Sequence, residues 1–190
     1  AAAESSGDAI LVLGAPGVPL AADTDVADDT LRAVWAALAR LHDAGLSHGE
    51  LTLEHIAIVG DEPVFSEFGS GKVAADHAER ARDVAVLLTS QALLVGADRA
   101  VDAAIAGLGA GRVAAAQPYL QRAAMPRSVV GPRLKTVLPA IGAAISDRTG
   151  CPAPEPAEIV RIRWRDLLQT GLILVAAYAL LTTLVELDWA

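Results

Sequence analysis

Histidine and acidic side chains gather in one short stretch of the chain, where they could carry acid–base or metal chemistry. His48 is followed closely by Glu50 and Glu54, and imidazole and carboxylate groups are both ligands of zinc in proteins. The spacing of these three residues fits no common ligand pattern. A metal site is therefore kept only as an alternative, and we expect no bound metal here.

A second candidate for chemistry is the run Gly69-Ser70-Gly71-Lys72, which suggests a phosphate-binding loop. Such a loop needs a further glycine five residues before the Gly-Lys pair, and a Ser or Thr directly after the lysine to bind the metal. This chain has neither, because Val73 follows the lysine. We interpret the run as a flexible turn.

The composition of the chain excludes some functions and favours one fold class. A net charge of -8 and the lack of a basic stripe argue against a nucleic-acid partner. The chain is 53% hydrophobic but only 4% aromatic, which favours helices packed around small side chains. The single cysteine, Cys151, cannot form an internal disulfide. We expect a mainly helical fold with a small β-hairpin.

The pattern of apolar and turn residues predicts where the elements lie. The apolar run 9–14 predicts a strand that leads into a Gly/Pro connector. A long helix follows, capped by Asp25 or Asp28 and stopped by Gly45. After a loop, two extended runs joined by turn residues 60–63 predict a hairpin. Further helices are predicted at 75–96, 98–107, 111–124 and 132–146, and Pro118 and Pro139 are expected to start or kink their helices.

Residues 167–185 form an uncharged, apolar run that is long enough, at about 1.5 Å per residue, to cross a bilayer. The run predicts a transmembrane helix, with a buried core helix of a soluble protein as the alternative. The flanking charges orient it: Arg161, Arg163 and Arg165 precede the run, and Glu186 follows it. The positive-inside rule then places the N-terminal domain in the cytoplasm, at the inner membrane.

These patterns divide the chain into three parts. Residues 1–148 form a domain, 149–160 a Pro-rich linker, and 161–190 a juxtamembrane segment with the membrane helix. The linker is expected to be stiff and extended because it is rich in proline.

The stretch LARLHDAGLSHGELTLEHIAI resembles the catalytic-loop region of the protein-kinase-like fold, and the resemblance to its C-terminal lobe covers residues 9 to about 146. Residues 47–50 (SHGE) stand at the family's His-x-Asp position, and His55 stands where these kinases carry Asn. Residues 67–69 (EFG) stand at the Asp-Phe-Gly position. The run 79–88 (ERARDVAVLL) resembles the following helix of aminoglycoside-phosphotransferase and UbiB-type kinases.

The resemblance assigns roles to particular residues. It implies that Asp83 holds the backbone of the catalytic loop. It also implies structural roles for His48, Phe68 and Gly69. A nucleotide base would be held weakly, without metal, by a hinge at Leu13, Gly14 and Ala15.

Each position that carries kinase chemistry departs from the active pattern. Glu50 and Glu67 keep a carboxylate but lengthen it, and a displacement of about 1 Å can cost about a hundredfold in rate. His55 replaces an oxygen ligand of Mg²⁺ by imidazole, which suits softer metals. The chain contains no Asn that could substitute. The resemblance therefore implies a catalytically impaired domain, a pseudokinase rather than an enzyme.

Residues 161–190 resemble the entry into the first span of a lysylphosphatidylglycerol-synthase-type, flippase-like membrane domain. That resemblance implies further spans after Ala190. The expected partners are this downstream membrane domain, the lipid bilayer and other proteins, with the kinase-like domain as a regulator or scaffold. Two alternatives stay open. One is an active phosphotransferase on a small molecule or lipid headgroup, with Glu50 as base and Glu67 as metal ligand. The other is a membrane-anchored helical interaction domain.

Overall fold

The structure is a computed structural model, and it describes residues 2–5, 8–11, 18–20, 25–152 and 154–157, together with Leu172, Val175, Ala176 and Tyr178. By its contacts the chain divides into two units, Ala1–Ala157 and Glu158–Ala190. The packing and the sites discussed below all belong to the first unit.

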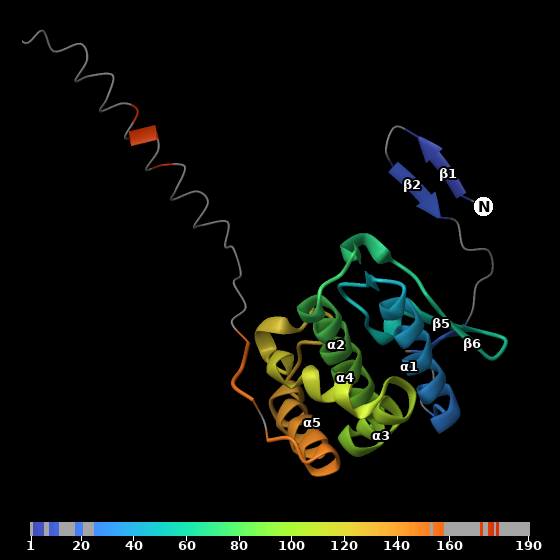
Figure 1. The fold of residues 1–190 in the computed structure, drawn as a ribbon, viewed down its shortest axis with the longest axis vertical. Coiled ribbons are helices and arrows are strands. Elements are labelled where there is room, and N and C mark those ends of the chain that lie inside the picture. The colour runs from blue at the N-terminus through green and yellow to red at the C-terminus, as the bar shows by residue number, and fades with distance from the viewer. Residues whose placement is uncertain are drawn as a thin grey trace, which may run out of the picture. The chain divides into compact units, whose positions relative to one another are not determined.

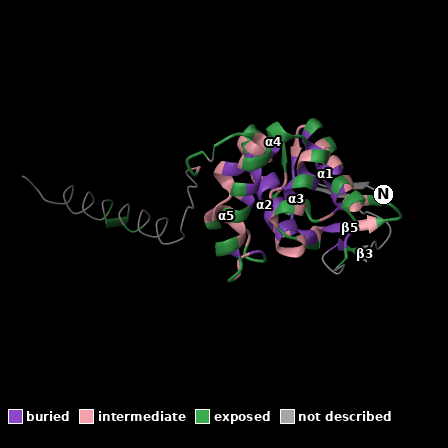
Figure 2. Cartoon of the chain, turned by 90° about the horizontal axis from the view of Figure 1, so that it is seen from below, coloured by how far each residue is buried: buried purple, intermediate pink, exposed green. Residues whose placement is uncertain are grey.

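Helices form most of this unit, and α2 is the most deeply buried of them (Figures 1 and 2). The five consecutive residues 84–88 of α2 are all buried, which requires neighbours on every side of a helix. Those neighbours include α3, α4 and α5. The helices are α1 (Asp28–Asp43), α2 (His77–Val95), α3 (Ala97–Leu108), α4 (Ala110–Ala115) and α5 (Leu134–Thr149).

The strands form three small antiparallel sheets within the described residues. Strands β1 (Ala2–Ser5) and β2 (Asp8–Leu11) pair with each other. Strand β5 lies between β3 and β6, and β4 pairs with β7. The pairing of β4 with β7 places Ser47 opposite Lys72. It joins the loop that follows β4 to the turn that precedes β7. The bounds are β3 Val18–Pro19, β4 Leu46–Ser47, β5 Ile56–Val59, β6 Glu62–Phe65 and β7 Lys72–Val73.

The predicted hairpin is present, but its turn is shorter than expected. Strand β6 already begins at Glu62, which pairs with Val59, and Pro63 pairs with Ile58. The turn therefore consists of Gly60 and Asp61, and Gly60 has a φ of +64° that suits glycine.

The predicted cap of α1 is wrong. The N-cap residue is Ala27, and no side chain caps the helix there. Asp28 is already helical, and its carboxylate accepts a hydrogen bond from Arg99 Nε at 2.5 Å instead. The predicted stop is present, since α1 ends at Asp43 and Gly45 follows with a φ of +79°.

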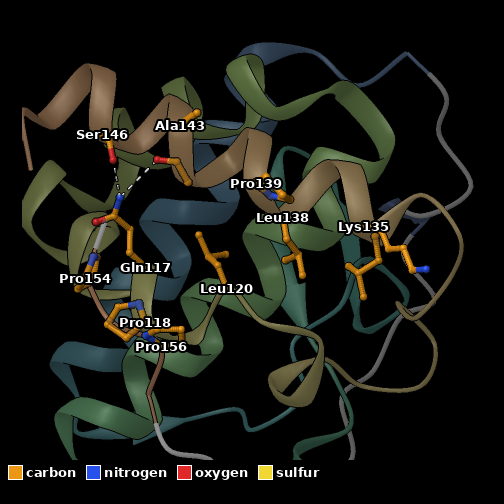
Figure 3. A pocket seen from close by; sticks show the side chains of 12 residues that line it. Gln117, Pro118, Leu120, Lys135, Leu138, Pro139, Ala143, Ser146, Pro154 and Pro156 are labelled. Atoms are coloured by element: carbon orange, nitrogen blue, oxygen red, sulfur yellow. Dashed lines mark hydrogen bonds between the residues drawn. The ribbon is translucent and has the colours of Figure 1, made fainter. Parts of the chain in front are cut away.

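The predicted helix at 111–124 is broken in the structure. Helix α4 ends at Ala115, and two short 3-10 turns follow at Gln117–Tyr119 and Arg122–Ala124. Pro118 explains the break because proline has no N–H for an α-helical hydrogen bond. The Gln117 side chain then turns to α5 and donates to Ser146 Oγ at 3.1 Å, as Figure 3 shows.

The Pro-rich segment after α5 packs on the helical unit along its described part. Ala157 N donates to Pro118 O at 2.9 Å, and Gln121 Nε2 donates to Ala157 O at 2.6 Å. Pro154 and Pro156 line a groove of about 500 Å³ together with residues of α5 (Figure 3). The segment is therefore held at the surface by two hydrogen bonds to the backbone of Ala157.

The predicted fold class, a kinase-like C-lobe with one transmembrane helix, needs correction. The described residues are mainly helical with small antiparallel hairpins, and none of their helices is long and apolar enough to span a membrane. The predicted span 167–185 lies largely outside the described residues.

Candidate functional site

The carboxylate of Asp83 holds the backbone of the loop that follows β4. Asp83 lies on α2 and is fully buried. Its Oδ2 accepts from His48 N at 2.7 Å, and its Oδ1 accepts from Gly49 N at 2.7 Å. His42 Nε2, from the last turn of α1, lies 3.3 Å from the same Oδ2. A buried carboxylate requires such partners, so α1, α2 and the loop are joined at this one group.

Gly49 brings this loop into direct contact with the turn after β6. Its φ is +89°, and a Cβ placed on it would lie 2.3 Å from the carbonyl oxygen of Ser70. Gly71 makes a similar approach from the other side, where a Cβ would lie 2.9 Å from the oxygen of Ser47. The two segments therefore fit together only because both positions lack a side chain.

His48 fills the space between the loop and the turn. Its Nε2 donates to Ser66 O at 2.7 Å, and its ring centroid lies 4.7 Å from that of Phe68. Its Nδ1 is buried and has no hydrogen-bond partner in the described part of the chain. Burial lowers the pKa of His48 below its usual 6.5, although the Ser66 carbonyl and Asp83 oppose this effect. The ring is therefore neutral, with its proton on Nε2.

Glu67 has a left-handed backbone and points its side chain towards His55. Its φ is 62° and ψ is 53°, a conformation that is costly for a residue other than glycine and is often found at functional sites. Its Oε2 lies 3.3 Å from His55 Nε2. His55 Nδ1 donates to the carbonyl of Glu50 at 2.8 Å.

The carboxylate of Glu50 is exposed, and it makes no hydrogen bond or ion pair with another described residue. It lines a polar cavity of about 170 Å³ between the loop, β7 and α2. Lys72 and Arg82 also line this cavity, and the Lys72 ammonium pairs with Glu79. A free carboxylate beside basic groups could accept a proton or attract a cation.

The structure brings most of the predicted site residues together. His48, His55, Glu67, Phe68 and Asp83 form one connected cluster. Gly69 lies in the adjoining 3-10 turn Phe68–Ser70. The predicted hinge residues Leu13, Gly14 and Ala15 lie outside the described residues. Within the described part of the chain, no group of three metal-ligating side chains is close enough to hold an ion.

The sequence-based reasoning missed His42. It is buried and contacts Asp83, as described above. A signal for its burial was present, because His42 lies four residues after the buried Leu38 on the same face of α1. Nothing in the sequence indicated its partner, which lies on α2.

The comparisons with known proteins give this site no family. No protein-family model matches the chain, and no curated protein matches it.

Proposed function

We propose that the first unit carries a degenerate kinase-like site that works by binding and does not transfer phosphate. The observation that carries the proposal is the contact between His55 Nε2 and Glu67 Oε2 at 3.3 Å. These are the two positions at which the resemblance to kinases would put Mg²⁺ ligands.

The chemistry of the pair supports an impaired site. Phosphoryl transfer depends on positioning and on metal ions that neutralise the phosphates. Mg²⁺ prefers hard oxygen ligands in a near-ideal octahedral arrangement. The His55 imidazole takes the place of an oxygen ligand, and it faces the Glu67 carboxylate that would have held the ion.

The surrounding scaffold supports the kinase-like part of the proposal. Asp83 holds the loop backbone through His48 N and Gly49 N, which is the role that the resemblance assigns to it. The His48 ring against Phe68 likewise links the loop to the turn. A site that has the backbone scaffold but different side chains at the catalytic positions suits a domain that binds a partner or a nucleotide.

One observation favours an active phosphotransferase as the second candidate. The Glu50 carboxylate stands at the family's base position and has no hydrogen-bond or ion-pair partner among the described residues. A free carboxylate is available to accept a proton from a substrate hydroxyl. Such an enzyme would act on a small molecule or a lipid headgroup.

The test is a phosphoryl-transfer assay on the full chain with labelled ATP and either Mg²⁺ or Mn²⁺. We expect no turnover with either metal. A Glu67→Ala variant is the decisive comparison, and Glu62→Ala is its control because Glu62 is an exposed carboxylate on β6. The proposal is contradicted, and the phosphotransferase favoured, if the wild-type chain turns over ATP, Glu67→Ala abolishes that turnover and Glu62→Ala preserves it.

A further inference from the structure

A cavity of about 220 Å³ lies among α1, α2 and α4, and its walls carry basic side chains on an acidic protein. The whole chain has 15 Lys and Arg and 4 His against 23 Asp and Glu. Among the described residues, no acidic side chain lines this cavity. Its lining consists of His42, His77, Arg80, Ala81, Val84, Arg112 and Ala115.

Arg80 supplies a positive charge that no carboxylate of the described residues neutralises. Its Nη1 donates to His42 O at 3.2 Å, and its Nε donates to Asp76 O at 3.3 Å. Both acceptors are neutral backbone carbonyls. They fix the guanidinium at the cavity, and no described residue forms an ion pair with it. A fixed guanidinium with free donors is suited to an oxyanion.

The other residues that line the cavity indicate which class of ligand it could bind. Arg112 adds a second guanidinium, although it also donates to Asp43 at 2.6 Å. Ala81, Val84 and Ala115 add an apolar surface. The volume is below the roughly 300 to 1,000 Å³ that is usual for sites of drug-sized ligands. A small molecule with one oxyanion group and one apolar group matches this combination.

We propose that this cavity binds a small organic anion, a phosphate monoester or a carboxylate with an apolar group. Arg80 and His77 hold the oxyanion, and Ala81, Val84 and Ala115 contact the apolar group. The cavity is separate from the His55–Glu67 contact, so this inference does not rest on the proposed function. Its ligand would lie beside His42, which also contacts Asp83.

The test is titration calorimetry of the full chain with phenyl phosphate, compared with inorganic phosphate and with phenol. We expect saturable binding of phenyl phosphate, and weaker binding of each of its two halves. Arg80→Gln should weaken the binding about tenfold or more, because it removes charge-assisted hydrogen bonds. Arg127→Gln is the matched control, since Arg127 is exposed and lines none of these walls.

A second variant covers the case in which Arg80→Gln fails to fold. His77 is exposed, so His77→Gln should fold and should still weaken phenyl phosphate binding several-fold. The proposal is overturned if phenyl phosphate does not bind, if His77→Gln and every folded Arg80 variant keep full affinity, or if Arg127→Gln loses as much affinity as they do.

Discussion

His55 Nε2 lies 3.3 Å from Glu67 Oε2, although the two residues come from segments on either side of a hairpin. The register of that hairpin explains their contact. Ile56 pairs with Phe65, and Ser66 N donates to His55 O at 2.9 Å, so the residues just outside the paired strands are neighbours. The hairpin register therefore brings the two residues together.

Replacing this pair by oxygen ligands should create a metal site. In a variant with His55→Asn and Glu67→Asp, no imidazole competes for the carboxylate, and both groups suit Mg²⁺ or Mn²⁺. We expect the double variant to bind Mn²⁺ in a water-relaxation titration, while the wild-type chain does not. Glu62→Asp is the control. If the wild-type chain binds Mn²⁺ and the Glu67→Ala variant does not, the His55–Glu67 contact does not prevent metal binding.

Asp83 should be among the most sensitive residues of the domain. Asp83→Ala leaves two buried N–H groups, those of His48 and Gly49, without an acceptor. Each buried unsatisfied group costs about 1 to 3 kcal/mol, so we expect the free energy of unfolding to fall by about 3 to 5 kcal/mol. Urea unfolding measures the change. Asp61→Ala on the exposed turn should change it by less than about 0.5 kcal/mol.

A loss of less than 1 kcal/mol in Asp83→Ala would mean that the buried carboxylate does not hold the loop. It would also remove the main structural support for the kinase-like proposal.

The neutral state of His48 gives the protein a pH dependence with a definite sign. Its folded pKa is lowered by burial, so the unfolded chain binds the proton more readily as the pH falls below about 6.5. The contribution of His48 to the free energy of unfolding is therefore fully present above pH 6.5, and it is lost as the pH falls through the folded pKa. The slope from this residue is at most about 1.4 kcal/mol per pH unit.

The comparison variant for this slope is His48→Gln, which can still donate to the Ser66 carbonyl but does not titrate. We expect its free energy of unfolding to vary less between pH 7.5 and 5.5 than that of the wild type. Arg127→Gln, at an exposed site that does not titrate in this range, should keep the wild-type slope. Equal slopes in wild type and His48→Gln would show that His48 is not held neutral.

Local patterns in the sequence were enough to find most elements of the first unit. The helix stopped at Gly45 and the hairpin at 55–68 follow from apolar periodicity and turn residues, and both are present. The failures have local causes too. A start or kink was expected at Pro118, but the helix is broken there and continues only as 3-10 turns, and Asp28 is helical and does not cap α1. Hydropathy alone predicted a membrane span that no described helix provides.

The candidate site was only partly predictable, for a different reason. The positions of His48, His55 and Glu67 could be proposed from their spacing. Their mutual contacts depend on the hairpin register and on the close approach at Gly49, which involve residues far apart in the sequence. The same holds for His42 and the basic cavity, whose walls come from three helices.

Gly49 and Gly60 provide a matched pair that separates backbone strain from crowding. Both have positive φ values, +89° and +64°, but only Gly49 has neighbours where a Cβ would lie. Gly60→Ala should cost about 1 kcal/mol, the price of a left-handed alanine. Gly49→Ala should cost at least about 2 kcal/mol more, because the methyl group meets the backbone of Ser70 and the loop must move. Urea unfolding of the two variants gives the difference, and equal losses would show that the loop and the turn do not pack as closely as 2.3 Å implies.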